Sequence, residues 1–200
     1  MWKLKSKKIV KGKWLDIMKL MIASDIHGSA YYCEKLLEAY RREGAEKLLL
    51  LGDLLYHGPR NDLPKDYAPK KVIAMLNEHK KELLCVRGNC EAEVDQMVLE
   101  FPVMADYAVL YLDDHTIFAT HGHIYNKKNL PPFKKGDILL HGHTHVQAVE
   151  RMEDYYYLNP GSVSIPKEDN VNSYMVYENH CFIIKDMEGN VIKSIEITEE

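Results

Sequence analysis

Short clusters of side chains that commonly bind metal ions recur at five points along this 200-residue chain. The clusters are Asp25-Ile26-His27, Gly52-Asp53, Gly88-Asn89-Cys90, Thr120-His121-Gly122 and Gly142-His143-Thr144-His145. Together they supply two carboxylates, one amide and four imidazoles, a mixed oxygen and nitrogen set that suits Mn, Fe, Zn and similar divalent ions. Two such ions held roughly 3.5–4 Å apart commonly cleave phosphate esters by in-line attack. The sequence therefore predicts a pair of metal ions that act on a phosphate ester.

Each cluster taken alone also has an ordinary structural explanation. Asp25 can cap a helix, and Gly52-Asp53 can form a turn in which glycine supplies an unusual dihedral angle. The pair of His143 and His145 is the strongest signal, because two imidazoles at a strand end are costly unless they are solvated or bind a metal. Each of the five clusters follows a short apolar run, and separate structural explanations do not account for that order.

The elements that must position these clusters are short strands and helices. Three buried strands are predicted in the first half, at Lys19–Ser24, Lys47–Leu51 and Glu82–Val86. A helix capped by Ser29 and stopped by Gly44 separates the first two strands, and a second helix begins at Pro69. This alternation favours parallel pairing with right-handed crossovers.

The second half of the chain is richer in strands. They are predicted at Tyr107–Leu112, Thr116–Thr120, Asp137–Leu140, Val146–Met152, Tyr155–Leu158, Ser173–Tyr177, Cys181–Lys185 and Val191–Ile197. Turns are predicted at Asp113-Asp114-His115 and Glu188-Gly189-Asn190. The predicted fold class is α/β (α+β): a four-layer α/β/β/α sandwich of two mixed β-sheets packed face to face with helices outside. Residues 18–200 are predicted to form this single domain.

The first 17 residues differ in charge from the rest. They contain six lysines and one aspartate, a net charge of +5, so the remaining chain carries about −9 (−4 minus +5). We expect residues 1–17 to be a weakly ordered basic extension that activity does not need. The alternative is that Val10–Leu15 adds a strand or a short helix. The acidic body argues against stable nucleic-acid binding, which needs a basic surface.

Cysteine usage and hydropathy bear on the compartment. Cys33, Cys85, Cys90 and Cys181 show no CxxC spacing, which favours free thiols in a reducing cytoplasm. No apolar run approaches the roughly 18–20 residues that cross a bilayer, and the lysine-rich start lacks the apolar segment of a secretion signal. The sequence therefore predicts a cytoplasmic protein without a membrane partner.

The ordered clusters resemble the calcineurin-like metallophosphoesterase superfamily. Closer details resemble its small prokaryotic YfcE-type phosphodiesterases, namely Ser24-Asp25-Ile26-His27-Gly28, His57-Gly58-Pro59-Arg60-Asn61, Val86-Arg87-Gly88-Asn89-Cys90 and Asn159-Pro160-Gly161-Ser162. The resemblance covers about Met18 to Ile197. It implies a phosphodiesterase, and a homo-oligomer that is a dimer or a tetramer.

The resemblance also implies two divalent ions, with Mn²⁺ the first expectation and Fe, Zn, Ni or Mg as alternatives. The implied metal ligands are Asp25, His27 and His145 for one ion, Asn89, His121 and His143 for the other, and Asp53 as the bridge. A water shared by two dications becomes hydroxide near neutral pH and attacks phosphorus in line.

One position departs from the family pattern. Many members of the superfamily carry a histidine directly after the Gly-Asn pair, where it protonates the leaving group, and here that residue is Cys90. A thiol with an ordinary pKa of about 8.5 is a poor substitute. We expect Asn89 to be a catalytic residue. Cys90 or His57 should protonate the leaving group only weakly, so we expect a preference for substrates with good leaving groups. His123 is a further candidate; for both histidines the alternative is a supporting or solvent-facing role.

Arg60 and Asn61 are candidates for binding substrate phosphate, and the competing interpretation is that they only shape their loop.

The sequence is compatible with two functions of different classes. The first is a metal-dependent phosphodiesterase acting on a small diester. The alternative is a metal-bearing protein-interaction scaffold of the same fold with little turnover. A purely structural zinc site is disfavoured, because no paired cysteine ligands are present.

Overall fold

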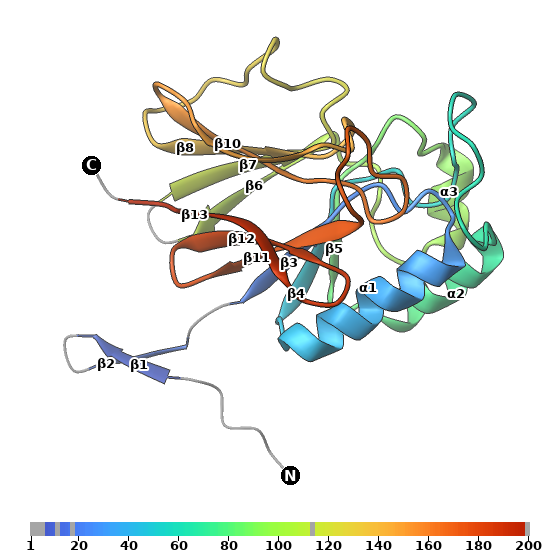
Figure 1. The fold of residues 1–200 in the computed structure, drawn as a ribbon, viewed down its shortest axis with the longest axis horizontal. Coiled ribbons are helices and arrows are strands. Elements are labelled where there is room, and N and C mark those ends of the chain that lie inside the picture. Colours follow the sequence, from blue (N-terminus) through green and yellow to red (C-terminus); the bar gives the residue numbers. More distant parts are fainter. Residues whose placement is uncertain (1–6, 11–12, 17–18, 113–114, 199–200) are drawn as a thin grey trace.

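Two β-sheets lie face to face in the computed structural model, which describes residues 7–10, 13–16, 19–112 and 115–198 (Figure 1). The six-stranded sheet has the order β13-β12-β11-β3-β4-β5. Its strands are β3 (Leu20–Ala23), β4 (Lys47–Leu50), β5 (Leu83–Cys85), β11 (Ser173–Glu178), β12 (Cys181–Asp186) and β13 (Val191–Glu196). The five-stranded sheet has the order β6-β7-β8-β10-β9. Its strands are β6 (Tyr107–Leu112), β7 (His115–Thr120), β8 (Asp137–His141), β9 (Gln147–Arg151) and β10 (Tyr155–Pro160).

The first half of the chain forms the parallel part of the six-stranded sheet. Strands β3, β4 and β5 pair in parallel, and helices α1 (Ala30–Glu43) and α2 (Pro69–Glu78) connect them. The hydroxyl of Ser29 accepts a hydrogen bond from the backbone N–H of Tyr32 and caps α1. Gly44 ends the helix with φ 63°, and its N–H donates to Tyr40. These predictions from the sequence are confirmed.

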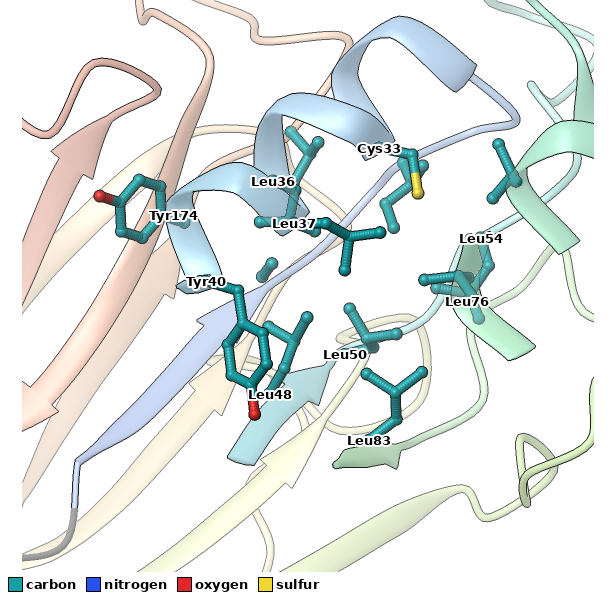
Figure 2. Packing of buried hydrophobic residues seen from close by; sticks show 14 of the residues in the cluster. Cys33, Leu36, Leu37, Tyr40, Leu48, Leu50, Leu54, Leu76, Leu83 and Tyr174 are labelled. Atoms are coloured by element: carbon teal, nitrogen blue, oxygen red, sulfur yellow. The ribbon is translucent and has the colours of Figure 1, made fainter. Parts of the chain in front are cut away.

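Alternate side chains of β4 enter two different cores, which explains its run of leucines. Leu48 and Leu50 face α1 and α2, where they pack against residues such as Leu36 and Leu76 (Figure 2). Leu49 faces the other sheet. A strand that is buried on both faces reads as continuous apolar sequence, and each buried leucine contributes about 1.5–3 kcal/mol.

The core between the sheets draws side chains from both of them. Ile117, Ile138 and Leu158 of the five-stranded sheet pack in one cluster with Leu49 and Phe182. The predicted sandwich of two mixed sheets is confirmed, since each sheet contains both parallel and antiparallel pairs. In the described part of the chain, helices cover only the six-stranded sheet, and the loop over residues 121–136 lies outside the other sheet (Figure 1).

The remaining elements lie away from the sheet cores. Strands β1 (Lys7–Val10) and β2 (Lys13–Asp16) pair with each other as a separate antiparallel hairpin, and α3 (Glu93–Val98) is a short helix after β5. The expectation for the basic extension also covers residues 1–6, 11–12 and 17, which are outside the described residues, and it stays a prediction. The predicted turn at residues 113–114 is likewise outside them, although β6 and β7 pair on either side.

The four cysteines are free thiols. Among the described residues, no helix combines the length and the apolar character that crossing a bilayer requires.

Candidate metal centre

All five polar clusters follow the carboxyl ends of strands, at one edge of the sandwich. Three come after the parallel strands β3, β4 and β5, and two come after β7 and β8, which are also parallel to each other. Backbone hydrogen bonds join the loops directly: Asp25 N–H donates to Gly52 O over 3.1 Å, and Gly142 N–H donates to His121 O over 2.9 Å. Segments up to 120 residues apart in sequence therefore meet.

The first set of predicted ligands, which we call the enclosed group, consists of Asp25, His27 and His145. Asp25 Oδ1 lies 3.5 Å from His27 Nε2 and 3.3 Å from His145 Nε2, and the two Nε2 atoms are 3.3 Å apart. All three side chains are buried. Asp25 Oδ1 is buried without a hydrogen-bond partner, which is costly for a carboxylate unless a cation is present.

The second set, the open group, consists of Asp53, Asn89, His121 and His143. His121 Nε2 is at its centre, 3.4 Å from Asp53 Oδ2, 3.2 Å from His143 Nδ1 and 3.2 Å from Asn89 Oδ1. Asp53 Oδ2 is also 3.7 Å from His27 Nε2 in the enclosed group. Asp53 therefore lies between the two groups, each of which brings at least three donor atoms within metal-binding reach of one another.

Backbone carbonyls orient three of the four imidazoles. The Nδ1 atoms of His27, His121 and His145 lie 2.7, 2.7 and 2.5 Å from the carbonyl oxygens of Tyr56, Leu51 and Ile165. Because a carbonyl only accepts hydrogen bonds, each Nδ1 must be the donor, and Nε2 is left facing the centre. This is the arrangement that fixes metal-binding histidines in proteins.

Five of these seven residues have left-handed backbone conformations. The φ angles of Asp25, His27, Asp53, His143 and His145 are 62°, 50°, 56°, 64° and 61°. Such a conformation costs a non-glycine residue on the order of 1–3 kcal/mol and persists only where surrounding contacts fix it. The hydrogen bonds between the loops provide those contacts, and strain of this kind concentrates at functional sites.

Two glycines allow the loops to approach the aspartates. A Cβ atom on Gly142 would overlap Ser24 Oγ and come within 2.8 Å of Asp25 Oδ2. A Cβ atom on Gly88 would overlap Asp53 Oδ1 and come within 2.8 Å of Glu91 Oε2. Any larger residue at either position would displace a carboxylate of the centre.

Glu91 is a part of the site that the sequence analysis missed. Its carboxylate accepts hydrogen bonds from the backbone N–H groups of Asp53, Leu54 and Gly88, at 2.9, 2.8 and 2.5 Å. Burial and the charge of Asp53 raise the pKa of Glu91. Glu91 thereby joins the loop after β4 to the loop after β5. The only sequence signal was an acidic residue directly after Gly88-Asn89-Cys90.

The charges of the ion-free centre are strongly perturbed. Burial alone would raise the pKa of Asp25, but the adjacent imidazoles of His145 and His27 hold it well below its usual range. Burial alone would lower the pKa of His121, but the hydrogen bond and charge of Asp53 raise it to about 9. Burial and the charge of His121 lower the pKa of His143 to about 4. Two buried carboxylates thus retain a proton on a neighbouring imidazole when no cation is bound.

A cavity of about 440 Å³ opens over the centre, with ligands of both groups in its floor. Arg60, Asn61 and Cys90 contribute to its walls, together with Lys167, which the sequence analysis did not single out. The amide of Asn61 donates to His57 O over 2.8 Å, so this contact favours the loop-shaping interpretation of Asn61.

Cys90 contacts the centre through its backbone. Its N–H donates to Asp53 Oδ1 over 2.9 Å, and its Sγ accepts a hydrogen bond from Asn89 Nδ2 over 3.3 Å. Burial and the charge of Asp53 raise the pKa of the Cys90 thiol. The thiol is therefore neutral and a weak acid.

Three further histidines lie close to the predicted ligands. His57 packs between two tyrosine rings, at 4.8 and 5.2 Å between centroids, and is not among the described residues that line the cavity. The His123 ring lies 5.5 Å from that of His121, and burial lowers its pKa. The Nδ1 of His141 pairs with Gly142 O over 2.9 Å.

Comparison with known proteins defines the class of this chain. Residues 18–180 match the family model of the calcineurin-like phosphoesterase superfamily domain. The chain belongs to this superfamily. The predicted family and enzyme class, a metal-dependent phosphodiesterase, are confirmed by this match and by the first of the relatives below.

Similarity to individual proteins is high for one relative. The chain is 48% identical over 163 residues to Phosphodiesterase YfcE of Escherichia coli K12, which is 82% of this chain and 89% of that protein. The solved structure of the E. coli YfcE phosphoesterase superposes with a TM-score of 0.88 at 44% identity, covering 90% of this chain and all of the other. Vps29 of Entamoeba histolytica in its Zn²⁺ complex has a TM-score of 0.58 at 18% identity, covering 90% and 100%, and shares the fold.

Proposed function

We propose that the enclosed group holds one divalent ion, that the open group holds a second, and that Asp53 bridges them for phosphodiester hydrolysis. The observation that carries the proposal is the position of Asp53 Oδ2, 3.4 Å from His121 Nε2 and 3.7 Å from His27 Nε2. A single carboxylate within reach of both groups suits two neighbouring cations. Two ions there would supply a nucleophilic water at neutral pH and positive charge opposite the phosphate.

The donor set fits such ions. Nitrogen and carboxylate oxygen donors suit Mn²⁺ and its first-row neighbours, and the unpaired buried Oδ1 of Asp25 is the kind of atom that a cation would satisfy. Mn²⁺ as the native ion, a dimer or tetramer, and a cytoplasmic location stay predictions.

The chain's own residues would determine how substrate binds. Asn89 is exposed and carries no charge, so it adds a ligand without repelling an anionic phosphate. Arg60 lies in the cavity wall, where it can contact an anionic group of the substrate. Glu91 holds the backbone of Asp53 and Gly88, which keeps the bridging carboxylate and the Asn89 loop in register.

The neutral Cys90 thiol gives poor proton donation to a leaving group. We therefore infer a preference for diesters whose leaving group needs no proton, such as aryl diesters. Alkyl phosphomonoesters should react slowly. An enzyme that cleaves alkyl monoesters faster than aryl diesters would contradict this part of the proposal.

The test is hydrolysis of bis-p-nitrophenyl phosphate by metal-free protein to which Mn²⁺ is added. We expect activity to depend on the metal and to be abolished in Asp53→Ala. The matched control is Asp154→Ala, which removes an exposed aspartate just before β10, at the opposite end of the strands. Full metal occupancy without turnover would instead support the alternative of a protein-interaction scaffold.

A further inference from the structure

Two cationic side chains at the cavity over the metal centre have no acidic partner. Arg60 and Lys167 both line this cavity and are exposed. Within the described part of the chain, neither forms an ion pair or a side-chain hydrogen bond. Several other lysines of this acidic protein are paired with carboxylates, for example Lys185 with Glu43 at 2.7 Å. Unpaired cations at a cavity are available to a ligand.

The two side chains come from different loops. Arg60 belongs to the loop after Asp53, and a Cβ atom on the nearby Gly58 would lie 3.8 Å from Cys90 Sγ. Lys167 belongs to the segment beside His145, since its N–H donates to His145 O over 3.3 Å. Arg60 is thus connected to the open group, and Lys167 to the enclosed group.

The Lys167 backbone is held firmly. Its carbonyl accepts hydrogen bonds from both the N–H and the Nδ2 of Asn170, at 3.2 and 2.7 Å. The preceding Ile165 carbonyl accepts from His145 Nδ1. The position of the Lys167 backbone is therefore fixed relative to a predicted metal ligand, and only its flexible side chain has to adapt to substrate.

The cavity offers little to an apolar group. Apart from Gly58 and Pro59, every described residue that lines it has a nitrogen, oxygen or sulfur atom in its side chain. At about 440 Å³ the cavity is also larger than a single phosphate requires, so part of the substrate beyond the reacting phosphorus fits inside.

Charge balance points to what that further part is. Two divalent ions and the carboxylates of Asp25 and Asp53 would leave a net charge of about +2 (+4 minus 2). A hydroxide and a monoanionic diester would neutralise it. The positive charges of Arg60 and Lys167 are then not needed to neutralise the reacting phosphate.

We propose that Lys167, together with Arg60, recognises a second anionic group on the substrate, so that the physiological diester carries a further phosphate or carboxylate. This inference rests on the proposed function. Lys167 acts as a specificity residue, and the reacting atoms are left to the metal centre.

The test uses p-nitrophenyl diesters that differ only in their second alcohol: ethanol, choline, glycolic acid or ethylene glycol monophosphate. All release the same chromophore, so only the second ester group varies. We expect the phosphate-bearing diester to exceed the ethyl diester in kcat/KM by about fivefold or more, mainly through KM, and the cationic choline ester to be the poorest. High salt should reduce the preference. A faster rate with glycolate, with phosphate or with both supports the inference and shows which anion is preferred.

The variants isolate the side chain. Lys167→Met should bring the ratio of phosphate-bearing to ethyl diester close to one, and Lys167→Arg should retain it. Lys81→Met is the matched control, because Lys81 is an exposed lysine just before β5, at the opposite end of that strand from the centre. Calorimetric binding of 2-phosphoethyl and ethyl methylphosphonate provides a readout that does not depend on turnover and should show the same difference.

Two results would overturn the inference. One is equal kcat/KM for the ethyl diester and both anionic diesters in the unmodified protein. The other is an equal loss with all four diesters in Lys167→Met, which would indicate a structural role. If none of the four diesters is hydrolysed with metal present, the proposed function itself fails.

Discussion

The enclosed and open groups of the metal centre are built from similar residues but differ in access. Asp25, His27 and His145 have exposed fractions of 0, 1 and 3%. In the open group Asn89 is exposed and His143 is only partly buried. Carbonyls orient both imidazoles of the enclosed group. In the open group a carbonyl orients His121, while His143 presents Nδ1 to the centre and is oriented by no backbone carbonyl among the described residues.

This difference indicates a division of labour. A group whose donors are buried and oriented before the ion arrives needs little rearrangement and should bind its ion tightly. A group with accessible side chains, such as Asn89 and His143, can change its ligation as substrate enters. Asp53 belongs to both environments, since it is buried yet lies between the two groups.

The largest expected effect comes from the enclosed group. Asp25→Ala should lower kcat by about a thousandfold or more, because it removes the only carboxylate of that group. Asn89→Ala, in the open group, should cost only about ten- to a hundredfold. Metal analysis should show one ion lost in Asp25→Ala and a weakened second ion in Asn89→Ala. Equal losses in both variants would contradict the division.

The frame that holds the groups together can be tested at Glu91. Glu91→Ala leaves three buried N–H donors without their acceptor and should lower the free energy of unfolding by about 3 kcal/mol. Denaturant unfolding measures the change. The exposed neighbour Glu93 is the control, and Glu93→Ala should change stability by less than about 0.5 kcal/mol. An unchanged midpoint in Glu91→Ala would show that water replaces the carboxylate freely.

The metal-free protein should become less stable as pH rises, because His121 of the open group loses its proton. The pKa of His121 is raised from 6.5 to about 9, so the stabilisation from its protonated form is fully present below pH 6.5. It is lost as pH rises toward 9, by on the order of 3 kcal/mol. Thermal melting of metal-free protein between pH 6 and 10 measures it. In His121→Gln the melting temperature should depend less on pH. An identical pH dependence in the two proteins would contradict the assignment of this effect to His121.

The smallest effect is expected at the leaving-group side of the open group. Cys90→His should accelerate an alkyl diester by about tenfold while changing bis-p-nitrophenyl phosphate little, because only the poor leaving group needs a proton. Steady-state kinetics with both substrates provides the comparison. A similar change with both would show that residue 90 does not act as a proton donor.

The sequence predicted those parts of the fold that depend on local pattern. The strand ending before Asp25, the helix between Ser29 and Gly44, and the leucine strand before Gly52 were each marked by hydrophobic period and by capping residues. The layer outside the five-stranded sheet was harder to predict from the sequence, because it is an irregular loop and such a loop has no periodic hydrophobic pattern.

The candidate site divides in the same way. The seven predicted ligands have side chains of types that commonly bind metal ions, so residue type and strand-end position were sufficient to select them as candidates. Glu91 and Lys167 carry no such signal, because their roles depend on what lies opposite them: three backbone N–H groups for one, an open cavity for the other.

The sequence by itself therefore determined the strands and supplied the seven predicted ligands that follow them, because both depend on residue types within short stretches of chain. Only the tertiary structure decided that Asn89 and His143 keep accessible surface while the other five predicted ligands are buried, and that two unpaired cations border the cavity. Burial and distance arise when segments far apart in the chain are packed together, and no local pattern records them.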